Sequence, residues 1–184
     1  MGLENGTALT YNLMDAAIEA AKRKGLLTPA KPTVSWAGEP RAFLMCRPLV
    51  EAIEAGKADP DEKARNRWAS LVADIAHFVE GGVINEKLMK PLMPEKFEHW
   101  ELRSCRPRPS LRVFGRFAKP DVFVGTHVMV RDGLRGMWSF EFEHEKLVCE
   151  DHWKAAGLPL PFSDPPHFAY EAYITENAHR TVRV

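Results

Sequence analysis

Four arginines and one histidine lie close together in the middle of this 184-residue chain, and all of them can act on a phosphate. They are Arg103, Arg112, Arg116, His127 and Arg131. Arginine binds phosphate through a planar fork of donors, and histidine exchanges a proton near neutral pH. Cleavage of RNA by its own 2′-hydroxyl needs a base, an acid for the leaving 5′-oxygen, and cations to stabilise the charge on the phosphate. These side chains are therefore candidates for the phosphate-binding and proton-transfer roles in such a reaction.

Three consecutive strands are predicted to position these side chains, near residues 99–104, 110–117 and 121–130. Each alternates apolar with polar residues, and proline-containing segments separate them. In the middle strand the alternation places Arg112, Phe114 and Arg116 on one face and Val113 and Phe117 on the other. The prediction is an antiparallel β-meander with an arginine-bearing face. Arginine also occurs on exposed strands for solubility and to block edge pairing, so a solvated face is the alternative.

Helices are predicted before this meander, at residues 11–24, at residues 42–55 with an interruption near Pro48, and at about residues 60–80. The last of these has an apolar stripe of Trp68, Leu71, Val72, Ile75 and Phe78. We expect Trp68, Leu71, Ile75 and Phe78 to pack against Val113, Phe117 or Val122. Residues 29–32 are predicted to be a linker, residues 33–36 a short strand, and residues 85–93 a helical or turn segment. The fold class is therefore α+β, with helices packed on the meander.

After the meander, residues 138–156 are predicted to be helical, with Phe142, Cys149 and Trp153 buried, and residues 168–179 to be a last helix or docked tail. The net charge of the chain is zero, but its charge is unevenly distributed. Residues 100–136 hold eight Lys/Arg and three Asp/Glu, which gives a net charge of +5. Residues 139–176 hold two Lys/Arg and eight Asp/Glu, which gives a net charge of −6. We expect the acidic segment to fold back near the arginine face and to lower its affinity for RNA.

The three cysteines are far apart and form no CxxC pair, which favours a reduced, cytoplasmic protein. No apolar run is long enough for a membrane span, and no signal peptide is evident. His144, Cys149 and His152 are close in sequence, but no second ligand pair accompanies them, so neither a metal nor another cofactor is expected. Phosphate-binding-loop, G-x-S-x-G and H-E-x-x-H motifs are absent, which argues against common nucleotide, acyl-hydrolase and zinc-protease chemistry.

A helical segment followed in order by LMKPL, WELR, LRVFGRF and VFVGTH resembles the core of the RelE/HigB-like toxin superfamily, in its phage-derived HigB-type branch. The resemblance covers roughly residues 62–150. It implies a RelE/ParE-like α+β domain over residues 33–156, with an N-terminal helical extension at 1–32 and a proline-rich C-terminal tail at 157–184. In that family a strand precedes the helices, and residues 33–36 are its expected position.

The resemblance also implies roles for individual residues. Arg112 resembles the mid-strand arginine that contacts phosphate, Arg103 matches the arginine of the ELR motif, and His127 and Arg131 match a histidine and the second of two lysines. The implied catalytic residues are Arg112, His127 and Arg131, and the implied RNA-binding residues are Arg103, Arg106, Arg108 and Arg116. Val130 and Glu101 depart from the pattern, because each stands where active relatives have a lysine.

Three functions remain open at this point. Members of the superfamily are ribosome-dependent mRNA endoribonucleases of toxin–antitoxin or phage-derived systems, and the resemblance implies that activity here. ParE-type relatives keep the fold but act on gyrase, so a non-catalytic protein that binds gyrase or an antitoxin is the first alternative. A phage accessory or structural protein is the second. The expected partners are mRNA on the ribosome and a cognate antitoxin, without a membrane, and the oligomeric state is left open.

Overall fold

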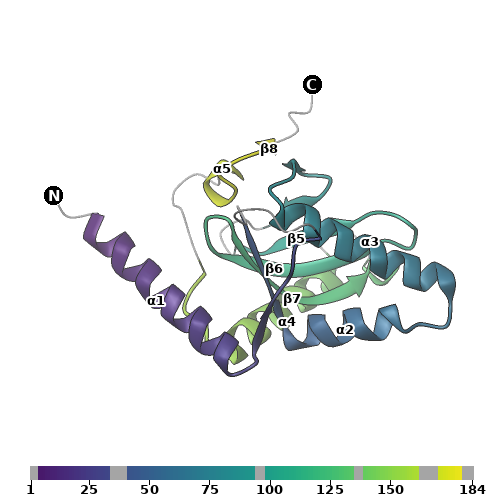
Figure 1. Ribbon diagram of the computed structural model, residues 1–184, viewed down its shortest axis with the longest axis horizontal. Coiled ribbons are helices and arrows are strands. Elements are labelled where there is room, and N and C mark those ends of the chain that lie inside the picture. The colour runs from purple at the N-terminus through teal and green to yellow at the C-terminus, as the bar shows by residue number, and fades with distance from the viewer. Residues whose placement is uncertain (1–3, 34–40, 94–97, 135–138, 162–169, 180–184) are drawn as a thin grey trace.

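The computed structural model describes residues 4–33, 41–93, 98–134, 139–161 and 170–179, which form an α+β fold (Figure 1). The helices are α1 (Glu4–Arg23), α2 (Arg47–Lys57), α3 (Glu62–Val79), α4 (Phe140–Ala155) and α5 (Tyr170–Tyr173). The strands are β1 (Leu27–Pro29), β2 (Ala42–Cys46), β3 (Ile84–Asn85), β4 (Met89–Pro91), β5 (Trp100–Ser104), β6 (Leu111–Lys119), β7 (Val122–Val130) and β8 (Ala178–His179).

The predicted meander is confirmed, because β5, β6 and β7 are consecutive antiparallel neighbours. They belong to a six-stranded sheet in the order β1-β2-β7-β6-β5-β4. The sheet as a whole is mixed, since β2 pairs with β7 in parallel. A second, two-stranded sheet joins β3 to β8. The strand β2 precedes α2 and α3 in the chain and lies beside the last strand of the meander.

Several predictions for the segments around the meander are wrong. Residues 42–46 form strand β2 rather than the first half of a helix, because the apolar run Phe43-Leu44-Met45 suits a parallel strand covered on both faces. The helix begins only at Arg47, and Pro48 is tolerated there since the first turn needs no N–H from it. Strand β1 takes up part of the predicted linker, and strand β4 part of residues 85–93. Of residues 33–36, only Thr33 is described, and it is not in a strand; the others lie outside the described residues.

Helices α2 and α3 cover one face of the sheet. Leu71, Ile75 and Phe78 of α3 share a buried cluster with Val113 and Phe117 of β6, as predicted. Trp68 is only half-buried and lies over Gly56 of α2, where an added Cβ would be 2.1 Å from the indole ring. The short side chain at position 56 therefore lets α2 and α3 approach closely.

Helices α1 and α4 cover the opposite face. Met14 and Ile18 of α1 share a buried cluster with Leu44 and Trp153, and Val122 packs against this cluster rather than against α3. Phe142 and Cys149 of α4 share another cluster with Phe114 of β6. The predicted helix over residues 138–156 and its three buried residues are thus confirmed where the chain is described.

The described part of the C-terminal region docks onto the core. The rings of Tyr170 and Tyr173 lie 5.5 Å and 5.1 Å from that of Trp100, and the Tyr170 hydroxyl donates to the carbonyl of Met89. The Thr175 amide donates to Asp121. These contacts confirm a docked segment, which continues as strand β8. Among the described residues, no helix combines the length and the apolar character needed to cross a membrane.

We expect Phe78→Ala to lower the free energy of unfolding by about 3–5 kcal/mol. The ring is fully buried against those of Phe43, Phe117 and Phe123, so its removal leaves a cavity between α3 and the sheet. Phe140→Ala is the matched control, because that ring is 81% exposed, and it should cost less than about 0.5 kcal/mol. Urea denaturation measures both, and similar losses in the two variants would contradict the packing described above.

Candidate functional site

The strand register brings three of the predicted site residues, Arg103, Arg112 and His127, into two rows on the face of the meander that α4 partly covers. One row pairs Arg103 with Arg112 and Arg112 with Met129. The other row, listed across the four strands from β4 to β7, is Lys90, Glu101, Phe114 and His127. Residues directly opposite each other in paired strands point to the same face. Phe114 packs under α4 and Val113 under α3, so the predicted alternation along β6 is confirmed.

Glu101 lies at the centre of a group of cations. Its Oε1 is 3.3 Å from Nε of Arg103, and its Oε2 is 3.4 Å from Nε of Arg112. The charges of Lys90 and Arg131 also act on this carboxylate. Burial raises the pKa of Glu101, and the four cations oppose that shift. We call Lys90, Glu101, Arg103, Arg112 and Arg131 the Glu101 cluster; its single carboxylate faces four positive charges.

The members of the Glu101 cluster differ in how accessible they are. Arg112 is 4% exposed, and its Nη1 donates to Ser110 Oγ and to the carbonyl of Leu111. Burial lowers the pKa of Arg112. Arg103 keeps 29% of its side chain exposed while its Nη1 donates to the carbonyl of Glu86. Arg131 is half-buried, with its guanidinium 5.8 Å from the centre of the Phe142 ring. Arg103 and Arg131 therefore form the accessible rim, and Arg112 and Glu101 lie behind it.

His127 lies under α4 and apart from the Glu101 cluster. Its ring stacks on Phe114 at 5.1 Å, and its Nε2 is 2.9 Å from Oε2 of Glu145 in α4. The Thr126 hydroxyl donates to the carbonyl of Phe114, so Nδ1 of His127, 3.0 Å away, is the donor to that hydroxyl. A proton must then lie between Nε2 and Glu145. Burial lowers the pKa of His127 to about 3 and raises that of Glu145, which favours the neutral pair over the ion pair.

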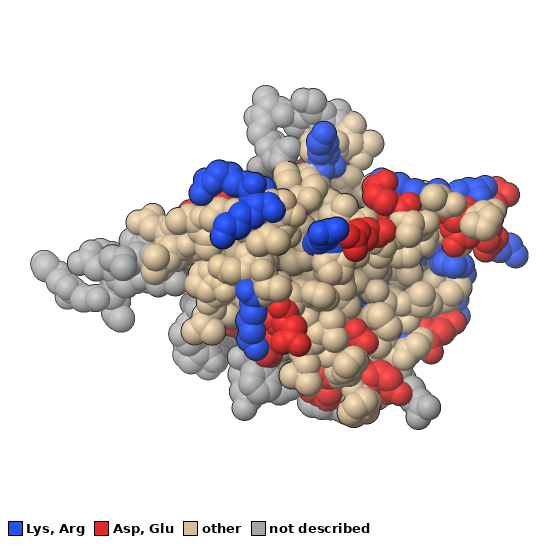
Figure 2. Space-filling view, turned by 90° about the horizontal axis from the view of Figure 1, so that it is seen from below, with Lys and Arg blue, Asp and Glu red and all other residues tan. Residues whose placement is uncertain are grey.

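Arg116 is also covered by α4. It is 8% exposed, its Nη2 is 3.7 Å from Oε1 of Glu150, and its guanidinium lies 6.0 Å from the centre of the Trp153 ring. The acidic helix thus does fold back on the arginine face, as expected from the charge distribution. Figure 2 shows the molecule from below the view of Figure 1, and on that face Lys/Arg and Asp/Glu are interspersed rather than gathered into one basic patch.

The other two arginines predicted to bind RNA, Arg106 and Arg108, lie in the loop between β5 and β6, and both are exposed. The structure therefore brings together Arg103, Arg112 and Arg131, but places His127 and Arg116 in separate buried pairs. Sequence reasoning missed Glu101, which it treated only as a lost positive charge. The available signal was spacing: Glu101 and Arg103 are two residues apart in a predicted strand, which puts them on the same face.

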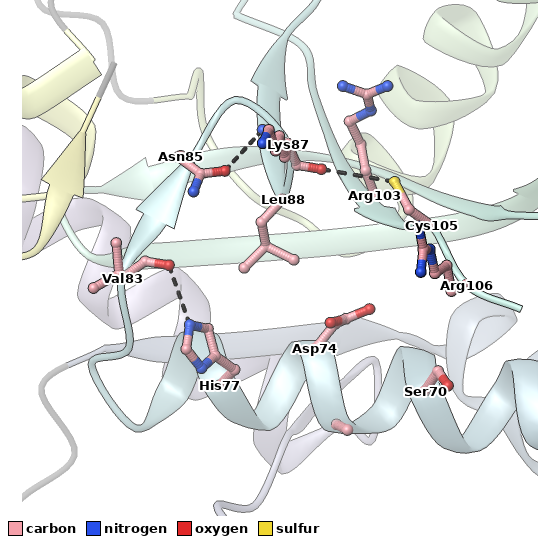
Figure 3. Close-up of a pocket in the computed structure, with 11 residues that line it drawn as sticks. Ser70, Asp74, His77, Val83, Asn85, Lys87, Leu88, Arg103, Cys105 and Arg106 are labelled. Carbon is pink, nitrogen blue, oxygen red and sulfur yellow. Dashed lines mark hydrogen bonds between the residues drawn. The ribbon is translucent and has the colours of Figure 1, made fainter. Parts of the chain in front are cut away.

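A groove of about 760 Å³ lies at the C-terminal end of β5, on the side away from the Glu101 cluster, between α3 and the strands β3 and β4 (Figure 3). Asp74 and His77 of α3 line one wall, and Leu88, Cys105 and Arg106 line the other. Burial raises the pKa of Asp74, and the neighbouring Ser104 hydroxyl opposes that shift. Sequence analysis did not identify this groove, because its walls come from segments far apart in the chain.

Among the described residues, no group of three or more His, Cys, Asp or Glu side chains has a geometry suited to a metal ion. Cys149 is fully buried beside Phe114 and Phe142, and burial raises the pKa of its thiol to about 11. Comparison with known proteins found no family model that matches the chain, and no match among curated proteins or solved structures.

We expect the protein to lose stability as the pH falls below about 6.5, the ordinary pKa of histidine. The folded-state pKa of His99 is about 3, because this imidazole is buried, so between these values the unfolded chain binds a proton that the folded chain excludes. The stabilisation is complete above pH 6.5 and is lost toward pH 3, by at most about 1.4 kcal/mol per pH unit for each such group. His127 does not contribute in this way, because its pair with Glu145 already holds a proton in the folded state.

Urea denaturation at pH 7, 6 and 5 tests this expectation. His99→Gln should flatten the dependence of the unfolding free energy on pH, because it removes the buried imidazole. His77→Gln is the control, since that side chain is exposed. A His99→Gln protein with the wild-type slope would contradict the buried, neutral state of this imidazole.

Proposed function

We propose that this chain is a toxin-like protein of the RelE/HigB type that binds RNA at the Glu101 cluster and acts as a ribosome-dependent mRNA endoribonuclease. The observation that carries the proposal is the gathering of four cations around one buried carboxylate on a sheet face. A carboxylate beside phosphate-binding forks provides a base next to the group whose charge must be stabilised. mRNA on translating ribosomes would be the substrate, in the cytoplasm, and a cognate antitoxin would be the protein partner.

The order of the elements also supports the proposal. A strand, β2, is followed by two helices, by the meander and by α4. A strand ahead of the helices is what the family resemblance implied, although it lies at residues 42–46 rather than 33–36. The WELR and LRVFGRF segments, on which the resemblance depends, form the paired strands β5 and β6, which hold Glu101, Arg103 and Arg112 of the Glu101 cluster.

The chemistry proposed for the cluster is as follows. Arg103 and Arg131 at the rim hold a phosphate of the RNA, and Glu101 accepts the proton of the adjacent 2′-hydroxyl. The 2′-oxygen then attacks phosphorus, the bond to the 5′-oxygen breaks, and a 2′,3′-cyclic phosphate forms. The leaving 5′-oxygen needs a proton, and within the cluster the Lys90 ammonium is the group that can transfer one, since arginine does not. His127 could serve only after α4 moves away from the meander.

A specific observation favours a second candidate, the non-catalytic protein that binds gyrase or an antitoxin. Arg112, Arg116 and His127 are each at most 8% exposed, and each lies against a carboxylate. Charges buried and paired in this way are costly to separate, so such a face can serve as a packed layer instead of a ligand-binding surface. In that case, exposed parts of the chain would make the contacts with a partner.

We expect Glu101→Gln to reduce cleavage of a message on stalled ribosomes by about 100-fold or more, because it removes the base and keeps the shape of the side chain. Arg112→Lys should retain part of the activity, since it keeps the charge but loses the fork. Glu150→Gln is the matched control: that carboxylate pairs with Arg116 outside the cluster, and cleavage should stay near the wild-type rate. Primer extension on the message measures cleavage, and thermal unfolding verifies that each variant is folded.

Three results would change the proposal. Growth arrest without cleavage by the wild-type protein would favour the protein-binding candidate. Full-rate cleavage by Glu101→Gln would keep the endoribonuclease and discard the Glu101 cluster as its site. A wild-type protein that neither arrests growth nor cleaves RNA would contradict both candidates.

A further inference from the structure

The groove beside α3 has side chains of three kinds arranged around one space. Figure 3 shows the Asp74 carboxylate directed from α3 toward the strands, the Leu88 side chain pointing into the groove, and Arg106 on the wall opposite α3. Lys87, which is exposed, adds a second cation to that wall. The Arg103 guanidinium points away from the groove in Figure 3, and its Nε lies 3.3 Å from Oε1 of Glu101. The groove therefore combines one acceptor, an apolar contact surface and two cations.

Local contacts hold the walls of the groove in place. Nε2 of His77 is 3.1 Å from the carbonyl of Val83, and its ring lies against Gly82, where an added Cβ would be 2.2 Å from the ring. The Lys87 amide donates to Oδ1 of Asn85, which closes the turn between β3 and β4. The Cys105 thiol lies 3.8 Å from the Lys87 carbonyl, so the two strand segments approach each other at this point. These contacts pre-organise both walls of the groove.

The residue types that line the groove favour an anionic ligand that carries a planar ring with hydrogen-bond donors. A carboxylate has two oxygens that can accept two parallel N–H bonds, and an unpaired guanine presents adjacent N1–H and N2–H donors on its Watson–Crick edge. Adenine, cytosine and uracil do not offer that pair of donors. Leucine provides a surface for the face of the base, and lysine and arginine attract the phosphate. A volume of about 760 Å³ is large enough for one nucleotide.

We propose that this groove binds an unpaired guanine nucleotide of RNA, with the base edge on Asp74, the base face against Leu88, and the phosphate near Lys87 and Arg106. The inference rests on the proposed function, because it makes the groove the place where an RNA cleaved at the Glu101 cluster is recognised. The two sites lie on opposite sides of residues 103–106, so an RNA strand that binds both must pass around this end of β5.

The test uses mononucleotides, so it does not depend on cleavage. Guanosine, inosine and adenosine 5′-monophosphates are titrated into the full chain, and the amide shifts of His77, Leu88 and Cys105 are followed by NMR. We expect the guanosine nucleotide to bind roughly tenfold more tightly than the adenosine nucleotide. The inosine nucleotide, which lacks the N2 amino group, should bind with intermediate affinity.

Variants separate recognition of the base from attraction of the phosphate. Asp74→Asn should remove the preference for guanosine over adenosine, and Asp132→Asn, at an exposed carboxylate outside the groove, should keep it. Lys87→Gln should weaken the binding of all three nucleotides by a similar factor. If Asp74→Asn does not fold, the comparison of guanosine, inosine and adenosine nucleotides on the wild-type chain still decides the question.

Equal affinities, or shifts confined to residues outside the groove, would overturn this inference. RNA cleavage at the Glu101 cluster without a guanine preference would remove the groove from the mechanism and leave the proposed function intact. A guanine preference in a protein that cleaves no RNA would support the groove as a nucleotide site and contradict the proposed endoribonuclease.

Discussion

Strand β6 is covered on both faces although it carries two arginines, and the arrangement of the rest of the molecule depends on how those charges are paired. Residues 111–118 of this strand are all buried. An unpaired charge in such a place is far more costly than a paired one. Glu101 of β5 lies beside Arg112, and Glu150 of α4 beside Arg116. The neighbouring strand and the covering helix are therefore held to β6 by charge as well as by apolar packing.

The sequence predicted correctly those strands and helices in which apolar residues repeat with a regular spacing. The alternation along β6 and the apolar stripe of α3 each specify one buried face, and the structure has both. Strand β2 was missed because Phe43, Leu44 and Met45 form a continuous apolar run, which has no period that distinguishes a strand from a helix. The distribution of charge predicted that α4 would lie near the arginines. It could not predict that Arg112 and His127 would be almost fully buried, because burial depends on contacts between segments distant in the chain.

The candidate site was also predicted only in part: its arginines were identified from the sequence, but Glu101 and the groove were not. Alternation placed Arg112 and Arg116 on one face of β6, but only Arg112 lies with Arg103 and Arg131 around Glu101, whereas Arg116 pairs with Glu150. Glu101 was next to them in the sequence pattern, but its importance follows from its position among cations on three other strands or turns. The groove required the folded structure, since Asp74, Leu88 and Arg106 belong to three separate segments. The pleat of β5 explains how the two regions stay apart: the Arg103 side chain points to one face, while Ser104 lies on the other beside Asp74.

The pairing of strands far apart in sequence has a consequence for how the chain acquires its structure. Ala42 of β2 pairs with Val122 of β7, and Ile84 of β3 pairs with Ala178 of β8. Contacts between such distant positions close long loops, and chains rich in them fold slowly. During synthesis, β2 has no parallel partner until β7 has left the ribosome, and Trp100 stays uncovered until Tyr170 and Tyr173 follow. The nascent chain therefore exposes a large apolar surface for most of its translation, which makes it a natural client for chaperones that bind such surfaces.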